Sequence, residues 1–125
     1  MSAQREVRDD LWTLILPPTM WAIHFVASYV LAAYACAPNV HVFRPISDVR
    51  IAIACFTALA LIVIGLSGRR AWHEWRRHGG GVQHAEDTAV GRERLLEFST
   101  FLLAALSFAS VIFTAVPVAI MADCR

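Results

Sequence analysis

Three long runs of apolar residues alternate with shorter polar segments along this 125-residue chain. The apolar runs cover residues 11–35, 49–66 and 98–122. Each is long enough to cross about 30 Å of hydrocarbon at about 1.5 Å per helical residue. The pattern predicts an all-α integral membrane protein with three transmembrane helices, forming a single membrane domain over residues 1–125. The stretches 37–48 and 67–97 are then the links between the spans.

The composition excludes a soluble catalytic domain. Hydrophobic residues make up 58% of the chain and charged residues 17%, with a mean hydropathy of +0.54, and a soluble domain of this length could not bury that apolar fraction. The formal charge of +1 predicts no binding to nucleic acid. The sequence has no glycine-rich phosphate loop followed by lysine, no nucleophile elbow, no HExxH and no paired zinc cysteines. We therefore expect no enzymatic activity, no metal and no cofactor.

The first apolar run follows an N-terminal tail that holds two arginines and three carboxylates. This mixed charge and the length of the run are not typical of a secretory signal, so we expect a retained span rather than a cleaved one. Pro17 and Pro18 fall inside the run, and each removes a backbone donor. They predict either a kink or a helix that starts late, near Pro17.

The second apolar run continues without a helix breaker until Gly79, Gly80 and Gly81. We expect one helix of about 30 residues, longer than the bilayer requires, that extends into the cytoplasm. Ser47 or Asp48 is expected to cap its start. The three glycines predict a flexible hinge after its end.

Two tryptophans lie in the charged part of this helix. Trp72 and Trp75 are three positions apart and share one face, flanked by Arg76 and Arg77. This arrangement is typical of a helix at the boundary between hydrocarbon and lipid headgroups, so we predict an interfacial anchor. A docking surface for a partner protein or for anionic lipid is the alternative.

The distribution of arginine predicts the orientation. The link 67–97 holds six arginines, whereas the link 37–48 holds Arg44 alone. By the positive-inside rule, the arginine-rich link and the N-terminus face the cytoplasm, and the C-terminus faces the periplasm. The predicted location is the inner membrane of a bacterium, crossed three times.

Two cysteines are predicted to reach the same membrane surface. Cys36 ends the first span, and Cys124 follows the third. Because the periplasm is oxidising, they are candidates for a disulfide that closes a long loop. Two free thiols are one alternative, and a copper or haem site that also uses His41 is another. Cys55, early in the second span, is interpreted as a small packing residue.

His24 lies near the middle of the first span, where an ionisable side chain usually faces protein, ligand or water rather than lipid. At 3.6 residues per turn, its face also carries Pro17, Trp21, Ser28 and Leu31. A matching line of hydroxyls in the third span consists of Thr100, Ser107, Ser110 and Thr114. We predict a contact between the neutral imidazole and one of these hydroxyls. Haem or metal ligation, a bond to a neighbouring subunit and a proton relay are the alternatives.

Small residues recur four positions apart in every span. They are Ser28, Ala32 and Cys36 in the first, Ala54 and Ala58 in the second, and Ala105 and Ala109 in the third. Such spacing lets helix backbones approach closely in lipid, either inside the bundle or in a larger complex. Glu93 and Glu97 come just before the third span and are expected to cap its helix.

One set of residues resembles a known family. The first span contains Trp21-Ala22-Ile23-His24-Phe25, followed by Tyr29 and Cys36, while Pro117 and Cys124 lie near the C-terminus. In these residues the chain resembles small three-helix bacterial membrane proteins that accompany haem-copper terminal oxidases of the cytochrome c type. The resemblance covers the first and third spans. It implies an accessory or assembly subunit of a respiratory oxidase, without a redox centre of its own.

The predicted function is therefore to pack against a terminal oxidase or a larger respiratory complex and stabilise it. The expected partners are other membrane subunits and lipids. The main alternative is a membrane protein that handles haem, copper or protons through His24 and the cysteines at the outer surface. A further alternative is a small transporter or channel that assembles as a homo-oligomer.

Overall fold

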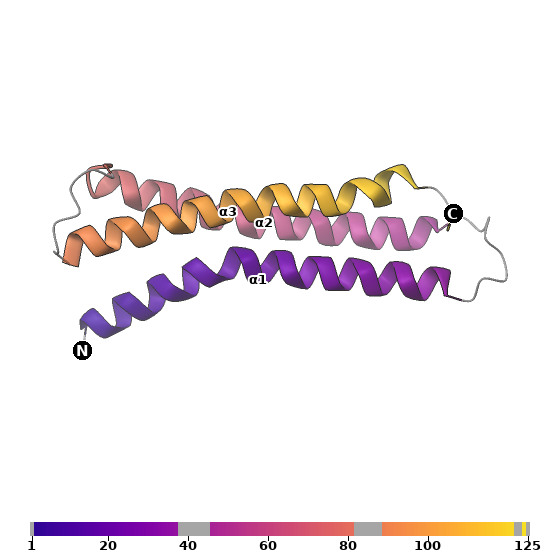
Figure 1. Cartoon of the computed structure of the whole chain (residues 1–125), viewed down its shortest axis with the longest axis horizontal. Coiled ribbons are helices and arrows are strands. Elements are labelled where there is room, and N and C mark those ends of the chain that lie inside the picture. Colours follow the sequence, from indigo (N-terminus) through magenta and orange to yellow (C-terminus); the bar gives the residue numbers. More distant parts are fainter. Residues whose placement is uncertain (1, 38–45, 82–88, 122–123, 125) are drawn as a thin grey trace.

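The computed structural model describes residues 2–37, 46–81, 89–121 and 124, which form helices and no strand. Three helices follow one another along the chain: α1 (Ser2–Cys36), α2 (Ser47–Arg77) and α3 (Ala89–Ile120). Each helix contacts the other two, and α2 runs opposite to α1 and α3 (Figure 1). The prediction of an all-helical architecture is confirmed for the described part of the chain.

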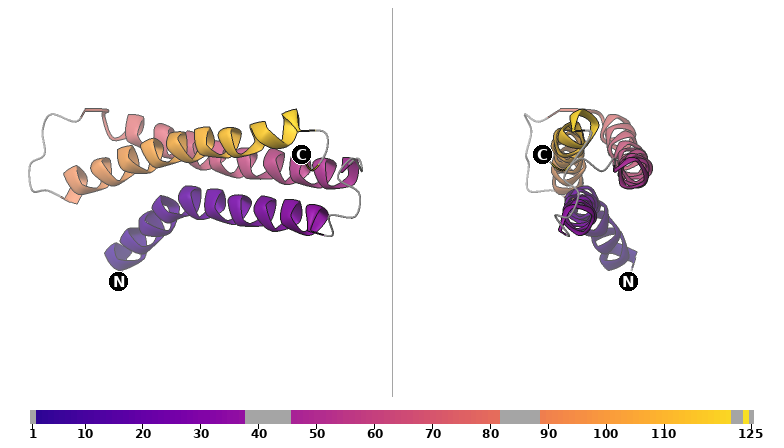
Figure 2. Two further views of the ribbon diagram at one scale, coloured as in Figure 1. Left: turned by 45° about the vertical axis from the view of Figure 1, so that its right-hand side comes forward. Right: turned by 90° about the vertical axis from the view of Figure 1, so that its right-hand side faces the viewer.

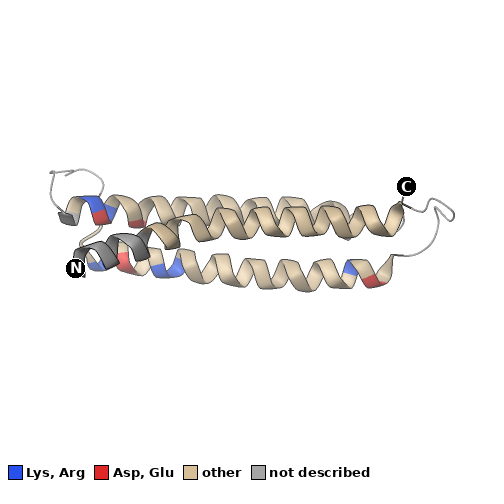
Figure 3. Cartoon of the chain, turned by 90° about the horizontal axis from the view of Figure 1, so that it is seen from below, with Lys and Arg blue, Asp and Glu red and all other residues tan. Residues whose placement is uncertain are grey.

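All three helices are long and apolar enough to span a membrane. The stretches that meet both conditions are Leu11–Cys36, Ser47–Arg77 and Gly91–Ile120. The charged residues drawn in Figure 3 gather at the two ends of the bundle, and the middle of each helix carries none. Because a charge at the centre of a bilayer is costly, this distribution suits a bundle whose long axis crosses the hydrocarbon. The chain is a multi-pass membrane protein by these criteria.

The two ends of the bundle differ in chemistry. We call the end where α1 finishes at Cys36 and α2 begins at Ser47 the disulfide end. We call the opposite end, where α2 finishes and α3 begins, the tryptophan end, after Trp72 and Trp75 in the last turns of α2. The helix α2 does continue beyond residue 66 to Arg77, and His78 at its C-cap separates it from the glycine run.

The helix starts differ from the predicted caps. Ile46 occupies the N-cap position of α2 and makes no capping hydrogen bond through its side chain, so the prediction that Ser47 or Asp48 caps this helix was wrong. Asp48 lies in the first turn, where a carboxylate still stabilises the helix dipole. The first turn of α3 holds no acidic residue. Glu93 and Glu97 lie further along that helix, so they do not cap it either.

Helix α1 is continuous through Pro17 and Pro18, so a late start near Pro17 is not observed. The helix instead bends, and its N-terminal part leans away from α2 and α3 (Figure 2). Neither proline can donate a hydrogen bond to the carbonyl four residues earlier, which is the usual cause of a bend inside a helix. The kink alternative is therefore the one that the structure supports.

A small core fills the space between the helices. Its buried residues are Ala60, Ile64, Ala104 and Val111, with Met20, Trp21 and Leu61 packed against them. The helices α2 and α3 approach closely at Gly68, where an added Cβ would lie 3.1 Å from the Cβ of Ala104. A glycine at this crossing lets the two backbones come together as they do in lipid-embedded bundles.

Most of the predicted small-residue pairs face outward. Ala54 and Ala58 on α2 are exposed, as are Ala105 and Ala109 on α3. They are therefore not what holds this bundle together. Because these alanines face outward, their spacing serves contact with lipid or with another molecule.

Candidate functional site

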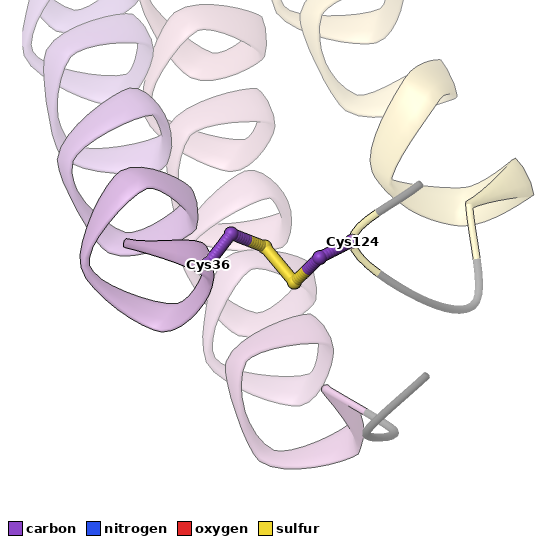
Figure 4. Close-up of a disulfide and its surroundings, with 2 residues drawn as sticks. All are labelled: Cys36 and Cys124. Carbon is purple, nitrogen blue, oxygen red and sulfur yellow. A yellow bond between two sulfur atoms is a disulfide. The ribbon is translucent and has the colours of Figure 1, made fainter. Parts of the chain in front are cut away.

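A disulfide joins α1 to the segment that follows α3. The sulfur atoms of Cys36 and Cys124 are bonded, the two Cα atoms lie 5.7 Å apart, and the cysteines are separated by 88 positions in sequence. Figure 4 shows the bond between the last turn of α1 and the chain beyond α3. The predicted pairing is therefore present, and both thiols are consumed by it. His41, the third member of the alternative copper or haem site, lies outside the described residues.

His24 is fully buried and contacts α2. Its Nε2 lies 2.8 Å from Oγ1 of Thr57 on α2, and the Thr57 hydroxyl donates to the carbonyl of Ile53 at 2.7 Å. Because a hydroxyl carries one hydrogen, Nε2–H of the imidazole is the donor to Thr57. The ring also stacks on Phe56, with centroids 5.6 Å apart and planes 13° apart. The imidazole thus joins α1 to α2 by one hydrogen bond and one ring contact.

The predicted partners of His24 on α3 were wrong. Ser110 donates to the carbonyl of Leu106 at 2.8 Å, and Thr114 donates to the carbonyl of Ser110 at 2.8 Å, so both hydroxyls bond within their own helix. Thr100 does the same with the carbonyl of Leu96. Ser107 is buried, but the residue bonded to the imidazole is Thr57.

The error has a simple source in the sequence. Thr100, Ser107, Ser110 and Thr114 fall on one side of the third span, whereas the second span carries a single threonine. Yet Thr57 is the only hydroxyl in the apolar run 49–66, near its middle, and this isolation was the available signal. The predicted polar face of α1 is partly confirmed, because Pro17, His24 and Ser28 are buried, whereas Leu31 is 38% exposed.

Three polar atoms on this face of α1 are buried and have no hydrogen-bond partner among the described residues. They are Nε1 of Trp21, Nδ1 of His24 and Oγ of Ser28. With Nε2 protonated, Nδ1 is an acceptor, whereas the indole N–H is a donor and the serine hydroxyl can be either. Buried polar groups without a protein partner are commonly paired with ordered water. The interior of the bundle therefore has a polar strip beside the apolar core.

An aromatic cluster fastens α2 to α3 at the tryptophan end. The ring centroids of Trp72 and Trp75 lie 5.0 Å apart, and those of Trp72 and Phe101 lie 4.9 Å apart. Trp75 lies 5.7 Å from Phe98, also on α3. The predicted anchor residues thus make intramolecular contacts that sequence spacing alone did not indicate. Such offset ring pairs contribute about 0.5–1.5 kcal/mol each beyond their buried area.

Charged side chains surround this cluster. The Arg76 guanidinium lies 5.2 Å from the centroid of the Trp72 ring, while Arg77 is exposed. Nδ1 of His78 lies 3.0 Å and 3.3 Å from the two carboxylate oxygens of Glu97. Glu97 therefore connects the end of α2 to α3, which is a different use from the capping role that the sequence suggested. Basic and aromatic residues together suit a membrane boundary.

The described residues contain no group of three or more histidine, cysteine, aspartate or glutamate side chains placed to hold a metal ion. Cys55, interpreted from the sequence as a packing residue, is exposed on the surface of α2, so that interpretation was wrong. The thiol lies in a stretch of α2 that can cross the membrane.

The face of α1 opposite His24 carries two alanines, two side chains with hydroxyls and two β-branched apolar residues. At 100° per residue it consists of Ile15, Thr19, Ala22, Val26, Tyr29 and Ala33, all exposed. The exposed fractions of Val26 and Tyr29 are 57% and 69%. We call these six residues the outer face of α1. In the sequence, Ala22 and Tyr29 stand out only as parts of the motif around His24.

No protein-family model, no curated protein and no solved structure matches this chain. None of the three comparisons links the chain to oxidase-associated proteins.

Proposed function

We propose that this chain is a non-catalytic accessory subunit that docks through the outer face of α1 onto a larger membrane complex, and that this complex is a respiratory terminal oxidase. The outer face of α1 is the observation that carries the docking proposal. The resemblance in the first and third spans is what names the oxidase.

The composition of the outer face favours a protein neighbour over lipid. Ala22 and Ala33 leave room for another helix to approach, and in membranes small residues mark the positions where helices pack. Tyr29 lies seven residues before Cys36, about 10 Å along the helix axis. Placing a hydroxyl against hydrocarbon without a hydrogen-bond partner costs at least about 1–3 kcal/mol of free energy. A neighbouring subunit would supply the acceptor and remove that cost.

The rest of the bundle supplies rigidity rather than chemistry. The disulfide holds α1 at one end, the His24–Thr57 bond holds it near the middle, and the aromatic cluster holds α2 on α3 at the other end. These three fastenings would keep the outer face of α1 in one orientation. A preorganised face binds its partner with a smaller loss of conformational entropy.

The orientation in the membrane belongs to the same proposal. The described arginines Arg69, Arg70, Arg76, Arg77, Arg92 and Arg94 belong to the tryptophan end. The positive-inside rule then places this end in the cytoplasm and the disulfide end in the periplasm of a bacterial inner membrane. An oxidising compartment at the disulfide end is consistent with the bonded cysteines.

The alternative of haem, copper or proton handling gains no support from the arrangement of residues. Both sulfur atoms that it would use are bonded to each other, and Nε2 of His24 is occupied by Thr57. Thiolate ligation by Cys36 and Cys124 would first require reduction of the disulfide. Accessory binding is therefore the function that the geometry supports best.

Co-purification tests the proposal directly. A tagged chain is extracted from its source membranes in mild detergent, and the bound proteins are identified by mass spectrometry. We expect oxidase subunits to accompany the wild type and to be lost from the Ala22→Phe/Ala33→Phe variant. Ala52→Phe places the same ring at an exposed position of α2 and serves as the matched control.

Two outcomes would count against the proposal. If no oxidase subunit accompanies the wild type in any preparation, the named partner is wrong. If oxidase subunits remain bound equally to the double variant and to the control, the outer face of α1 is not the docking surface.

A further inference from the structure

A groove of about 590 Å³ lies between α2 and α3 toward the disulfide end. Its walls are formed mainly by Ile51, Ala54, Ala58 and Leu61 from α2 and by Ala115 and Ala119 from α3. The volume falls within the range of about 300–1,000 Å³ that is usual for small-molecule sites. Below the mouth of the groove, the lining side chains are apolar except for Thr57, which also bonds His24.

The small side chains explain why the groove exists. Ala54 and Ala58 face outward four residues apart, and Ala115 and Ala119 repeat that spacing on the neighbouring helix. Where four alanines meet, the two helices present a furrow instead of interlocking side chains. A hydrocarbon chain is the kind of group that fills such an apolar furrow at the level of the lipid tails.

Arg50 lies at the mouth of the groove, near the start of α2. One terminal nitrogen of its guanidinium donates to the carbonyl of Ala119 on α3 at 2.9 Å. A guanidinium has five N–H donors, so this bond leaves most of them available. Among the described residues, no carboxylate forms an ion pair with Arg50. The structure thus places a positive charge, held across the two helices, beside an apolar furrow.

We propose that this groove binds one anionic glycerophospholipid, with its phosphate on Arg50 and an acyl chain against the alanines. Arginine is well suited to phosphate because its planar fork can make two parallel hydrogen bonds. The Ser47 side chain, also at the groove mouth, offers a further hydroxyl donor. Charge complementarity at the mouth and apolar walls below it together match one lipid molecule better than a protein helix, which would bring no phosphate.

The length of the groove agrees with one leaflet. From Ser47 to Leu61 the lining residues span 14 steps of α2, or about 21 Å at 1.5 Å per residue. One half of the hydrocarbon core is about 15 Å thick, and the headgroup region accounts for the remainder. A lipid of the leaflet at the disulfide end would therefore fit with its phosphate at Arg50 and its chain alongside Ala58.

This site is separate from the docking face proposed above, because it lies on α2 and α3 rather than on the outer face of α1. Its test needs no partner complex. The purified full chain, with the disulfide intact, is titrated with phosphatidylglycerol or with phosphatidylcholine of the same acyl chains. Native mass spectrometry then counts the lipids that each chain retains.

We expect one retained phosphatidylglycerol per chain and a preference of about tenfold over phosphatidylcholine, the effect of one charge-assisted contact. Arg50→Gln should abolish the preference, and Arg50→Lys should retain most of it. Arg69→Gln, at an exposed arginine far from the groove, should leave it unchanged. Ala58→Phe should remove the retained lipid by filling the groove, whereas Ala109→Phe, exposed on α3 outside the groove lining, should not.

Two results would overturn the proposal. One is equal retention of the two lipids with no effect of Arg50→Gln, which would show only the unspecific lipid coat of any membrane protein. The other is a dimer that holds no lipid and that Ala58→Phe dissociates, which would show that a second copy of the chain fills the groove.

Discussion

Cys36 and Cys124 are bonded to each other although 88 positions separate them, and this bond connects the end of α1 to the chain beyond α3. Two helices that are not consecutive in sequence are thereby fixed at the same end of the bundle. In the chain-entropy treatment, closing a loop of this length stabilises the folded state by about 4.6 kcal/mol. The bond is therefore expected to be a main restraint on α1, whose N-terminal part leans away from the other helices (Figure 2).

Removing the disulfide should lower stability. We expect the Cys36→Ala/Cys124→Ala variant to unfold at lower temperature than the wild type, and reductant to lower the midpoint of the wild type but not that of the variant. Cys55→Ala, at an exposed cysteine outside the bond, should behave like the wild type. Mass spectrometry shows whether the reductant has opened the bond. If the bond is open and the melting temperature of the wild type is unchanged, the disulfide does not stabilise the fold.

The His24–Thr57 bond should be measurable as a coupling between α1 and α2. Thr57→Val leaves the buried Nε2–H without a partner, and we expect a loss of about 1 kcal/mol in unfolding free energy, within the range found for hydrogen bonds between membrane helices. Combining it with His24→Phe, which retains a ring for stacking, should cost less than the sum of the single changes.

The matched control for this cycle is Thr114→Val, because the Thr114 hydroxyl bonds only within α3. Its combination with His24→Phe should be additive. Strict additivity for the Thr57 pair as well would mean that the bond contributes nothing to the fold.

The crossing of α2 and α3 depends on the absence of a side chain at Gly68. Gly68→Leu would drive a branched side chain into Ala104. Even the Cβ of the new residue would lie only 3.1 Å from the Cβ of Ala104. We expect a loss of about 1–3 kcal/mol, the usual cost of overpacking, in a denaturant titration in mixed micelles. At Gly65, which is exposed, an added Cβ meets nothing within 4 Å, so Gly65→Leu should be nearly neutral. Equal effects at the two glycines would refute the crossing.

The sequence predicts the three helices better than it predicts the contacts between them. Apolar runs located the three spans because hydropathy reports which residues face hydrocarbon. It does not report where a helix ends in water: residues 89–97 hold charges and no proline, and α3 begins at Ala89. The helix hydrogen-bond pattern continues past the apolar part, so the link predicted as 67–97 is much shorter.

The contacts could be predicted only where few partners were available. Cys36 had a single cysteine at the same predicted surface, and that pairing is present. For His24, hydroxyls on two helices were possible partners. Choosing between them requires knowing how each helix is rotated about its own axis. The helical period of 3.6 residues shows which residues share a face, but not which neighbouring helix that face contacts. For the same reason, the pairing of Trp72 with Phe101 and the close approach of Gly68 to Ala104 were not foreseen.

The membrane orientation is open to a direct prediction. Tags are added before Met1 and after Arg125, and protease is applied to sealed membranes from one side. The arginine-rich tryptophan end should be cytoplasmic, so the N-terminal tag should be cleaved only in inverted vesicles and the C-terminal tag only in right-side-out ones. Cleavage of both tags from one side would contradict an odd number of spans.

The most direct test of the proposed function is photo-crosslinking from the outer face of α1 in source membranes. A photoreactive phenylalanine derivative replaces Tyr29, an exposed aromatic residue of the same face, or Ala52 as the control, and the crosslinked products are identified by mass spectrometry. We predict a crosslink from position 29 to a terminal-oxidase subunit and none from position 52. Crosslinks to lipid alone from both positions would contradict it.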